Sequence, residues 1–163
     1  MTQEIAASMM IALALLLLGL AWWGWHNRRR RFHHLEGALI RELPGSPPLL
    51  SFDGLYVATT VANKPMDRIP VGPLSFRAKA RFSLHPEGMV IGAQGEVPVL
   101  LDAKGGIQAG LATWTIDRVV EPEGLVMVRW NLGETEVDSY LRVTETNPNA
   151  VVDAVNSMRG KTE

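Results

Sequence analysis

Ser83, His85 and Glu87 stand at alternate positions of the stretch SLHPEG, and their side-chain types are those of a nucleophilic catalytic triad. A triad works only if each member forms a hydrogen bond with its neighbour. Alternate residues of a β-strand lie about 7 Å apart along the chain, so we expect no Ser–His–Glu hydrogen bonds here. We interpret His85 as a histidine at the turn that leads out of a strand.

The other three histidines, His26, His33 and His34, are poor candidates for a metal site. On a continuous helix, positions 26 and 33 lie about 10 Å apart along the axis, whereas zinc ligands lie about 2 Å from the ion. The adjacent pair points in different directions, and the chain has no cysteine. The sequence also lacks a glycine-rich phosphate loop. We therefore expect no catalytic residue, no metal and no cofactor, and an enzyme is the least favoured function.

The segment before these histidines has the composition of a transmembrane helix. Residues 6–25 carry no charge, and residues 13–18 are almost all leucine. A helix of about 20 residues covers the roughly 30 Å hydrocarbon core of a bilayer. A cleavable signal peptide needs positive charge before the apolar run and small residues at its end, but only Glu4 precedes this run and tryptophans end it. We therefore predict one uncleaved transmembrane helix at residues 6–26.

Tryptophans and arginines at the end of this run predict its orientation, because tryptophan is enriched at headgroup level and flanking arginines stay in the cytoplasm. We expect residues 1–5 to lie outside and residues 27–48 to form a basic juxtamembrane segment with a Pro-rich linker. Residues 49–163 are then a cytoplasmic domain at the plasma (inner) membrane. The expected membrane-interface residues, whose arginines face anionic headgroups, are Trp22, Trp23, Trp25, Arg28, Arg29, Arg30 and Arg31.

The chain beyond the apolar run is mildly acidic. Arg28–Arg31 are four of the 16 Lys and Arg residues, whereas Glu4 is the only one of the 17 Asp and Glu residues that precedes Leu35. Residues 35–163 therefore carry a net charge near −4. Nucleic-acid binding depends on basic residues that neutralise phosphates, so we expect no nucleic-acid partner.

Beyond Pro48 the hydrophobic period changes to two, which is typical of half-buried antiparallel strands. Glycine-containing turns separate the alternating runs, and this spacing predicts about seven strands in a small barrel or sandwich. The predicted strands cover residues 54–62, 79–85, 88–95, 97–102, 111–120, 125–134 and 135–143.

Alternation also predicts which side chains point inward. The inward set comprises Leu55, Val57, Thr59 and Val61 in the first strand, Ala80, Phe82 and Leu84 in the second, Val126, Val128, Trp130 and Leu132 in the sixth, and Val137, Ser139, Leu141 and Val143 in the last. Asp138 and Tyr140 fall on the opposite, polar face of the last strand.

One amphipathic helix is predicted at residues 148–159, after all the strands. Asn147 is a good N-cap, Pro148 suits the first helical position, and Gly160 supplies a stop. The apolar stripe of this helix contains Val151, Val152, Val155 and Met158. We expect the stripe to cover an open end of the barrel.

Seven strands and a C-terminal helix are the outline of the pleckstrin-homology (PH) superfold. The motifs GLYVATT, MDRIPVGPL, HPEGMVI, GLVMVRWNLG and VDSYLRV follow in this order behind a single apolar run. In these motifs the chain resembles a family of small actinobacterial single-pass membrane proteins with a bacterial PH-like domain, often labelled as export proteins or transporters. The resemblance covers most of the chain and implies a PH-like α+β fold without established catalytic residues. One span that carries no charge over residues 6–25 cannot enclose a substrate path, so the transporter label lacks physical support.

The favoured function is a binding or adaptor domain that recruits or organises a protein partner at the membrane. Two alternatives stay open: recognition of a lipid headgroup, and an accessory role in a larger membrane complex. Lipid recognition is less favoured because residues 62–73 offer only Lys64 and Arg68 as basic groups. The candidate partner-binding residues, chosen as exposed on polar strand faces or turns, are Asp67, Arg68, Lys79, Arg81, Arg129 and Tyr140.

Overall fold

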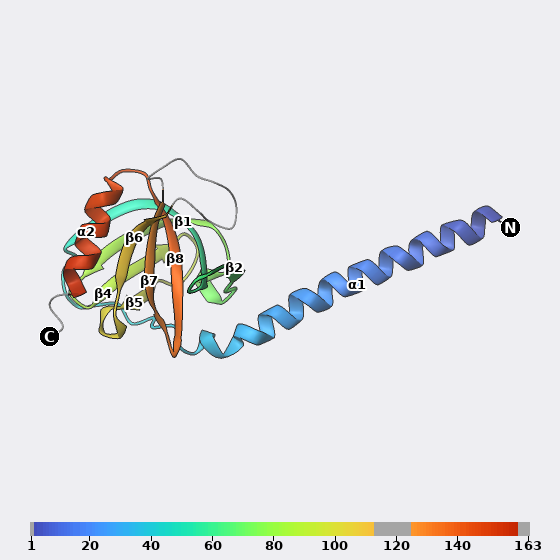
Figure 1. Ribbon diagram of the computed structural model, residues 1–163, viewed down its shortest axis with the longest axis horizontal. Coiled ribbons are helices and arrows are strands. Elements are labelled where there is room, and N and C mark those ends of the chain that lie inside the picture. Colours follow the sequence, from blue (N-terminus) through green and yellow to red (C-terminus); the bar gives the residue numbers. More distant parts are fainter. Residues whose placement is uncertain (1, 113–124, 160–163) are drawn as a thin grey trace. The chain divides into compact units, whose positions relative to one another are not determined.

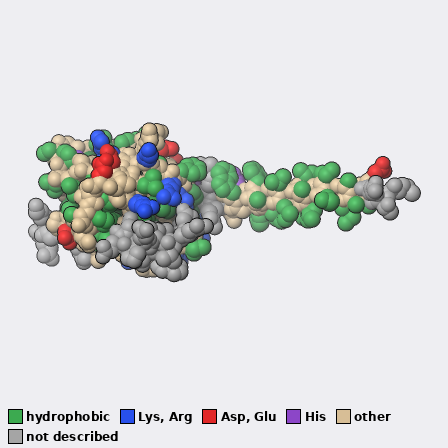
Figure 2. Space-filling view, turned by 90° about the horizontal axis from the view of Figure 1, so that it is seen from above, with side chains coloured by type: hydrophobic (Ala, Val, Ile, Leu, Met, Phe, Trp, Pro, Cys, Tyr) green, Lys and Arg blue, Asp and Glu red, His purple; other side chains and the backbone are tan. Residues whose placement is uncertain are grey.

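The computed structural model describes residues 2–112 and 125–159 (Figure 1), and the chain forms two compact units, residues 1–34 and 35–163. Helix α1 spans Thr2–Glu36 and contains the predicted helix. Among the described residues, Glu4–Glu36 is the one stretch of helix long and apolar enough to cross a membrane. Figure 2 shows hydrophobic side chains on the visible face of α1 along most of its length. A helix that is apolar on every side suits a lipid or a fully buried environment.

The second unit is built on one antiparallel sheet, as the alternating pattern predicts. Its strands follow the order β5-β4-β3-β1-β8-β7-β6, and β2 pairs with β1 outside this path. The strands are β1 (Leu50–Val61), β2 (Lys64–Arg68), β3 (Ala78–His85), β4 (Gly88–Ala93), β5 (Val99–Asp102), β6 (Gln108–Ala112), β7 (Leu125–Leu132) and β8 (Thr135–Val143).

The barrel core confirms most of the predicted inward faces. Phe82 is fully buried and stacks on Phe52, with ring centroids 5.2 Å apart. The predicted inward residues of β3 and β7 are all buried, and so are those of β8 up to Leu141. The hydroxyl of Ser139 accepts a hydrogen bond from Trp130 Nε1 at 2.9 Å, so these two buried polar groups satisfy each other.

The face prediction for β1 is wrong in its first half, because a β-bulge lies between Tyr56 and Ala58. A bulge inserts one extra residue and reverses which side chains face the core beyond it. Tyr56 is therefore fully buried in place of Leu55, and its hydroxyl lies 2.8 Å from Thr59 Oγ1. After the bulge, Thr59 points inward as predicted.

Strand β2 (Lys64–Arg68) was not predicted. Its sequence, KPMDR, contains a proline and few apolar residues, which favours a loop. Proline is tolerated in a strand only at an edge, and β2 pairs only with the end of β1. The following residues, including the 3₁₀ turn η1 (Gly72–Leu74), pack over β1, and Tyr56 Oη lies 3.1 Å from the carbonyl oxygen of Leu74. Strand β6 begins three residues before the predicted start, and residues 113–120 of that prediction lie outside the described residues.

Helix α2 (Pro148–Arg159) confirms the predicted C-terminal helix and packs on β6 and β7. Asn147 Oδ1 accepts a hydrogen bond from the Asn149 amide at 2.9 Å, as expected of an N-cap. The side chain of Asn156 bonds both backbone groups of Ala109 on β6, accepting from its N–H at 2.8 Å and donating to its carbonyl at 3.0 Å. Figure 1 shows α2 beside β6. The helix therefore covers the edge of β6 that has no strand partner among the described residues.

The segment between α1 and β1 is fastened to the barrel. The amide of Leu100 on β5 donates to the carbonyl of Ile40 at 2.8 Å, and the amide of Leu49 donates to the carbonyl of Leu84 at 2.7 Å. Because these contacts fix both ends of the segment, residues 40–49 form part of the surface of the second unit.

Candidate binding groove

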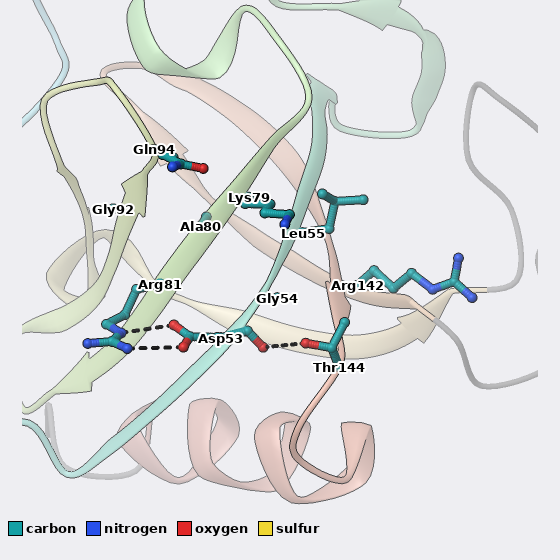
Figure 3. A pocket seen from close by; sticks show the side chains of 10 residues that line it. All are labelled: Asp53, Gly54, Leu55, Lys79, Ala80, Arg81, Gly92, Gln94, Arg142 and Thr144. Carbon is teal, nitrogen blue, oxygen red and sulfur yellow. Dashed lines mark hydrogen bonds and ion pairs between the residues drawn. The ribbon is translucent and has the colours of Figure 1, made fainter.

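The outer face of β4, β3, β1 and β8 carries a hollow that we call the basic trough, with a volume of about 990 Å³. Two rows of side chains cross it (Figure 3). The lower row contains Gly92, Arg81, Asp53 and Thr144, and the upper row contains Gln94, Lys79, Leu55 and Arg142. Lys79 and Arg81, both candidates from the sequence, therefore lie in the same hollow.

The lower row is held by an ion pair between neighbouring strands. Arg81 Nε and Nη2 donate to the two carboxylate oxygens of Asp53 at 2.8 and 3.0 Å. The hydrogen bonds from Arg81 lower the pKa of Asp53, and the same contact raises the pKa of Arg81. The hydroxyl of Thr144 donates to the Asp53 backbone carbonyl at 3.0 Å, which continues the row to the end of β8. This row is therefore nearly neutral and gives the trough a fixed wall.

The upper row carries the positive charge of the trough. Leu55 on β1 is directly opposite Lys79 on β3 and Arg142 on β8. In the part of the chain that the structure describes, neither cation has a side-chain hydrogen bond or an ion pair. Adjacent strands lie about 4.8 Å apart, so the two cationic side chains start about 10 Å apart with one apolar side chain between them. This arrangement suits an anionic ligand that also has an apolar group.

Two of the residues that line the trough are glycines, Gly54 and Gly92. A Cβ on Gly54 would collide with the backbone carbonyl of Arg142, so only glycine lets β1 approach β8 this closely. Gly92 on β4 lies opposite Arg81 and leaves the floor of the hollow without a side chain. Gly54 thus allows the close approach of β1 and β8, and Gly92 leaves an empty position in the hollow.

A second, smaller hollow of about 250 Å³ adjoins the basic trough, and Arg81 and Gly92 line both. We call it the apolar pocket, because Leu43, Pro44, Val90 and Pro98 form much of its wall. We refer to the trough and the pocket together as the groove. The groove runs along β3 from Lys79 in the trough to His85 in the pocket. This distance is about 20 Å at the rise per residue of a β-strand.

The apolar pocket contains one ordered polar pair, formed by Ser83 and His85. The expectation that these residues are too far apart to bond is wrong, since Ser83 Oγ lies 3.0 Å from His85 Nε2. The Cα separation on a strand does not limit a histidine, whose ring extends back along the chain. His85 Nδ1 lies 2.9 Å from the carbonyl oxygen of Ser46. A carbonyl can only accept, so Nδ1 carries the proton and Nε2 accepts from the Ser83 hydroxyl.

Glu87 does not complete a catalytic triad with this pair. Its carboxylate accepts a hydrogen bond from the hydroxyl of Ser46 at 2.5 Å, and this bond lowers the pKa of Glu87. In a triad His85 Nδ1 would bond the Glu87 carboxylate, but here it bonds the Ser46 carbonyl. This bond fastens the segment before β1 to the barrel. Ser83 presents an oriented polar group in the groove.

The remaining candidate residues lie away from the groove. Arg129 on β7 donates to Asp138 from Nε at 2.7 Å and from Nη2 at 2.9 Å, and the hydrogen bonds raise its pKa. The expected exposed face of β8 is wrong at Asp138 and Tyr140, which are only 3 and 5% exposed. Tyr140 packs with Val57 in a second apolar cluster, and burial raises its pKa.

Asp67 and Arg68 end strand β2 and do not line the groove. Arg68 Nη2 donates to the carbonyl of Val57 at 3.3 Å, so at least part of its guanidinium has a structural role. The sequence-based choice missed Asp53, Leu55, Gln94, Arg142 and Thr144. Arg142 could have been found, since alternation already placed it on the outer face of the last strand.

The described unit, an antiparallel barrel with a C-terminal helix over β6, has the architecture of a PH-like domain. The profile of the bacterial PH domain-like family matches residues 39–156, and the chain belongs to this family. The match starts after α1 and covers every strand of the barrel. A search of curated proteins finds no match to the chain. PH-like domains are typically non-catalytic binding modules.

Proposed function

We propose that the protein is a single-span protein of the inner membrane whose cytoplasmic PH-like domain recruits a protein partner through the groove. The observation that carries this proposal is the upper row of the trough, in which Leu55 lies between two cations without ion-pair partners in the described chain. Cations that only keep a surface soluble can lie on a flat surface. Lys79 and Arg142 instead line a hollow of about 990 Å³.

The membrane part of the proposal is supported by α1 and by the residues at its end. Residues 6–25 of the helix carry no charge, and Trp22, Trp23 and Trp25 precede the arginines at 28–31. Aromatic residues at headgroup level followed by arginines favour a cytoplasmic position for the residues beyond them. Because the segment after α1 is fastened to the barrel at Ile40 and Ser46, a bound partner would be held close to the membrane surface.

Site-specific photo-crosslinking in intact cells tests this function. A photoreactive amino acid at Leu55 should form an adduct with a discrete protein, because this position lies between the two cations. The same amino acid at Lys104, which is exposed and does not line the groove, is the matched control. The adduct should disappear in the double variant Lys79→Glu/Arg142→Glu and persist in Lys64→Glu/Lys104→Glu. An adduct with lipid alone, or equal adducts from both positions, would refute the proposal.

A further inference from the structure

We infer that the groove binds an extended protein segment that is acidic at one end and apolar at the other. This inference rests on the proposed function and specifies the chemistry of the partner. It starts from the fact that the two hollows adjoin each other and share Arg81 and Gly92 in their walls.

The two ends of the groove differ in chemistry. At one end, Lys79 and Arg142 flank Leu55, and neither cation is neutralised by a described side chain. At the other end, Leu43 and Pro44 face Val90 and Pro98. Between the ends, Arg81 is already bound to Asp53, so it adds little further attraction for an anion. A ligand that matches the groove therefore has its negative charge over the upper row and its apolar group over the pocket.

The length of the groove fits a peptide strand. About 20 Å along β3 corresponds to roughly six residues of extended chain. The polar groups along this path, the Gln94 amide and the Ser83 hydroxyl, offer hydrogen bonds that a peptide backbone can use. An extended segment with carboxylates about six residues from an apolar side chain would meet both ends at once.

A protein segment fits these observations better than a membrane surface or a lipid tail. A lipid tail needs an enclosed apolar cavity, whereas Leu43 at the apolar end is itself 57% exposed. Residues 35–163 carry a net charge near −4. The field of the domain as a whole therefore repels an anionic bilayer. Lys79 and Arg142, which have no ion-pair partner among the described residues, lie on either side of one leucine. They attract a negative charge locally, over a distance shorter than the Debye length of about 8 Å in cells.

Selection of peptides on the full-length protein tests the inference. The protein is placed in nanodiscs of phosphatidylcholine, and a phage library of random ten-residue peptides is selected against it, with empty nanodiscs as the counter-selection. The enriched sequences should share Asp or Glu near one end and Leu, Ile, Val, Met or Phe about six residues away. A synthetic peptide with this consensus is then used for affinity measurements.

Charge reversal makes the test specific. Lys79→Glu/Arg142→Glu should weaken the consensus peptide by more than about tenfold, and selection on this variant should enrich Lys or Arg at the same end. Leu43→Ser should weaken binding at the apolar end and leave the charge preference intact. The matched control Lys64→Glu/Lys104→Glu has the same net charge as the first variant and should bind the consensus peptide like the unchanged protein.

Three results would overturn the inference: no enriched consensus, a consensus without an acidic end, or one that is indifferent to Lys79→Glu/Arg142→Glu. Binding of phosphatidylglycerol vesicles that is lost in the same variant, with no peptide consensus, would assign the groove to lipid instead. The in-cell crosslink from Leu55 reports separately on the proposed function. If that adduct forms while the peptide consensus fails, the groove recruits a protein of different chemistry.

Discussion

Replacing Asn156 with alanine should loosen the edge of the barrel that α2 covers. The half-buried side chain forms two hydrogen bonds with Ala109, at 2.8 and 3.0 Å. A hydrogen bond contributes about 1 kcal/mol net, and a buried group left without a partner costs more. We therefore expect Asn156→Ala to lower the free energy of unfolding by about 2 kcal/mol. At about 4 °C per kcal/mol for a domain of this size, Tm should fall by about 8 °C.

The assay combines thermal unfolding of the full-length protein in nanodiscs with hydrogen exchange of the peptide that covers β6. The β6 amides, including that of Ala109, should exchange faster in the variant, because the outer edge of β6 loses its hydrogen bonds with the Asn156 side chain. Asn149→Ala is the matched control, since Asn149 is an exposed residue of the same helix. If Asn156→Ala and Asn149→Ala had the same Tm and the same β6 exchange, the reasoning that α2 holds the barrel through this amide would be refuted.

Two further predictions concern charges. Arg129→Met should destabilise the domain by about 3 kcal/mol, because it leaves the carboxylate of Asp138, only 3% exposed, without its cation. Denaturant unfolding measures this loss of stability. The double variant Arg129→Met/Asp138→Asn should recover part of it. The pKa of Asp53 is lowered from 3.8 by its hydrogen bonds from Arg81, so its contribution to stability is present above pH 3.8 and is lost as the pH falls through the lower, folded-state pKa. Denaturant midpoints of Asp53→Asn should therefore decline less steeply with acid in this range than those of the unchanged protein, and parallel profiles would contradict the ion pair.

The elements whose local pattern agrees with their final environment were predictable from sequence. Strands β3 and β7 alternate strictly and bury one face, and α2 carries both its cap at Asn147 and its apolar stripe. The errors occur where tertiary contacts override alternation. The bulge after Tyr56 turns Leu55 outward, and packing against Val57 buries Tyr140 on a face that looked polar.

The candidate site was predictable only in part, for a related reason. Lys79 and Arg81 stand out as charged residues on the outer face of a strand, but the hollow also needs residues from three other strands. Leu55 and Arg142 become neighbours only through the register of β1 with β8. The contact of Ser83 with His85 depends on where Ser46 places its carbonyl, and no local pattern encodes a contact 39 residues apart in the chain.

Recruitment of a cytosolic partner requires the domain to lie in the cytoplasm, and the absence of cysteine from the chain allows a direct measurement of its position. Single variants Glu4→Cys and Lys104→Cys are treated in intact cells with a maleimide reagent that does not cross membranes. Glu4→Cys should be labelled in intact cells, and Lys104→Cys should be labelled only after the membrane is permeabilised. Labelling of Lys104→Cys in intact cells would place the groove outside and refute a cytoplasmic domain.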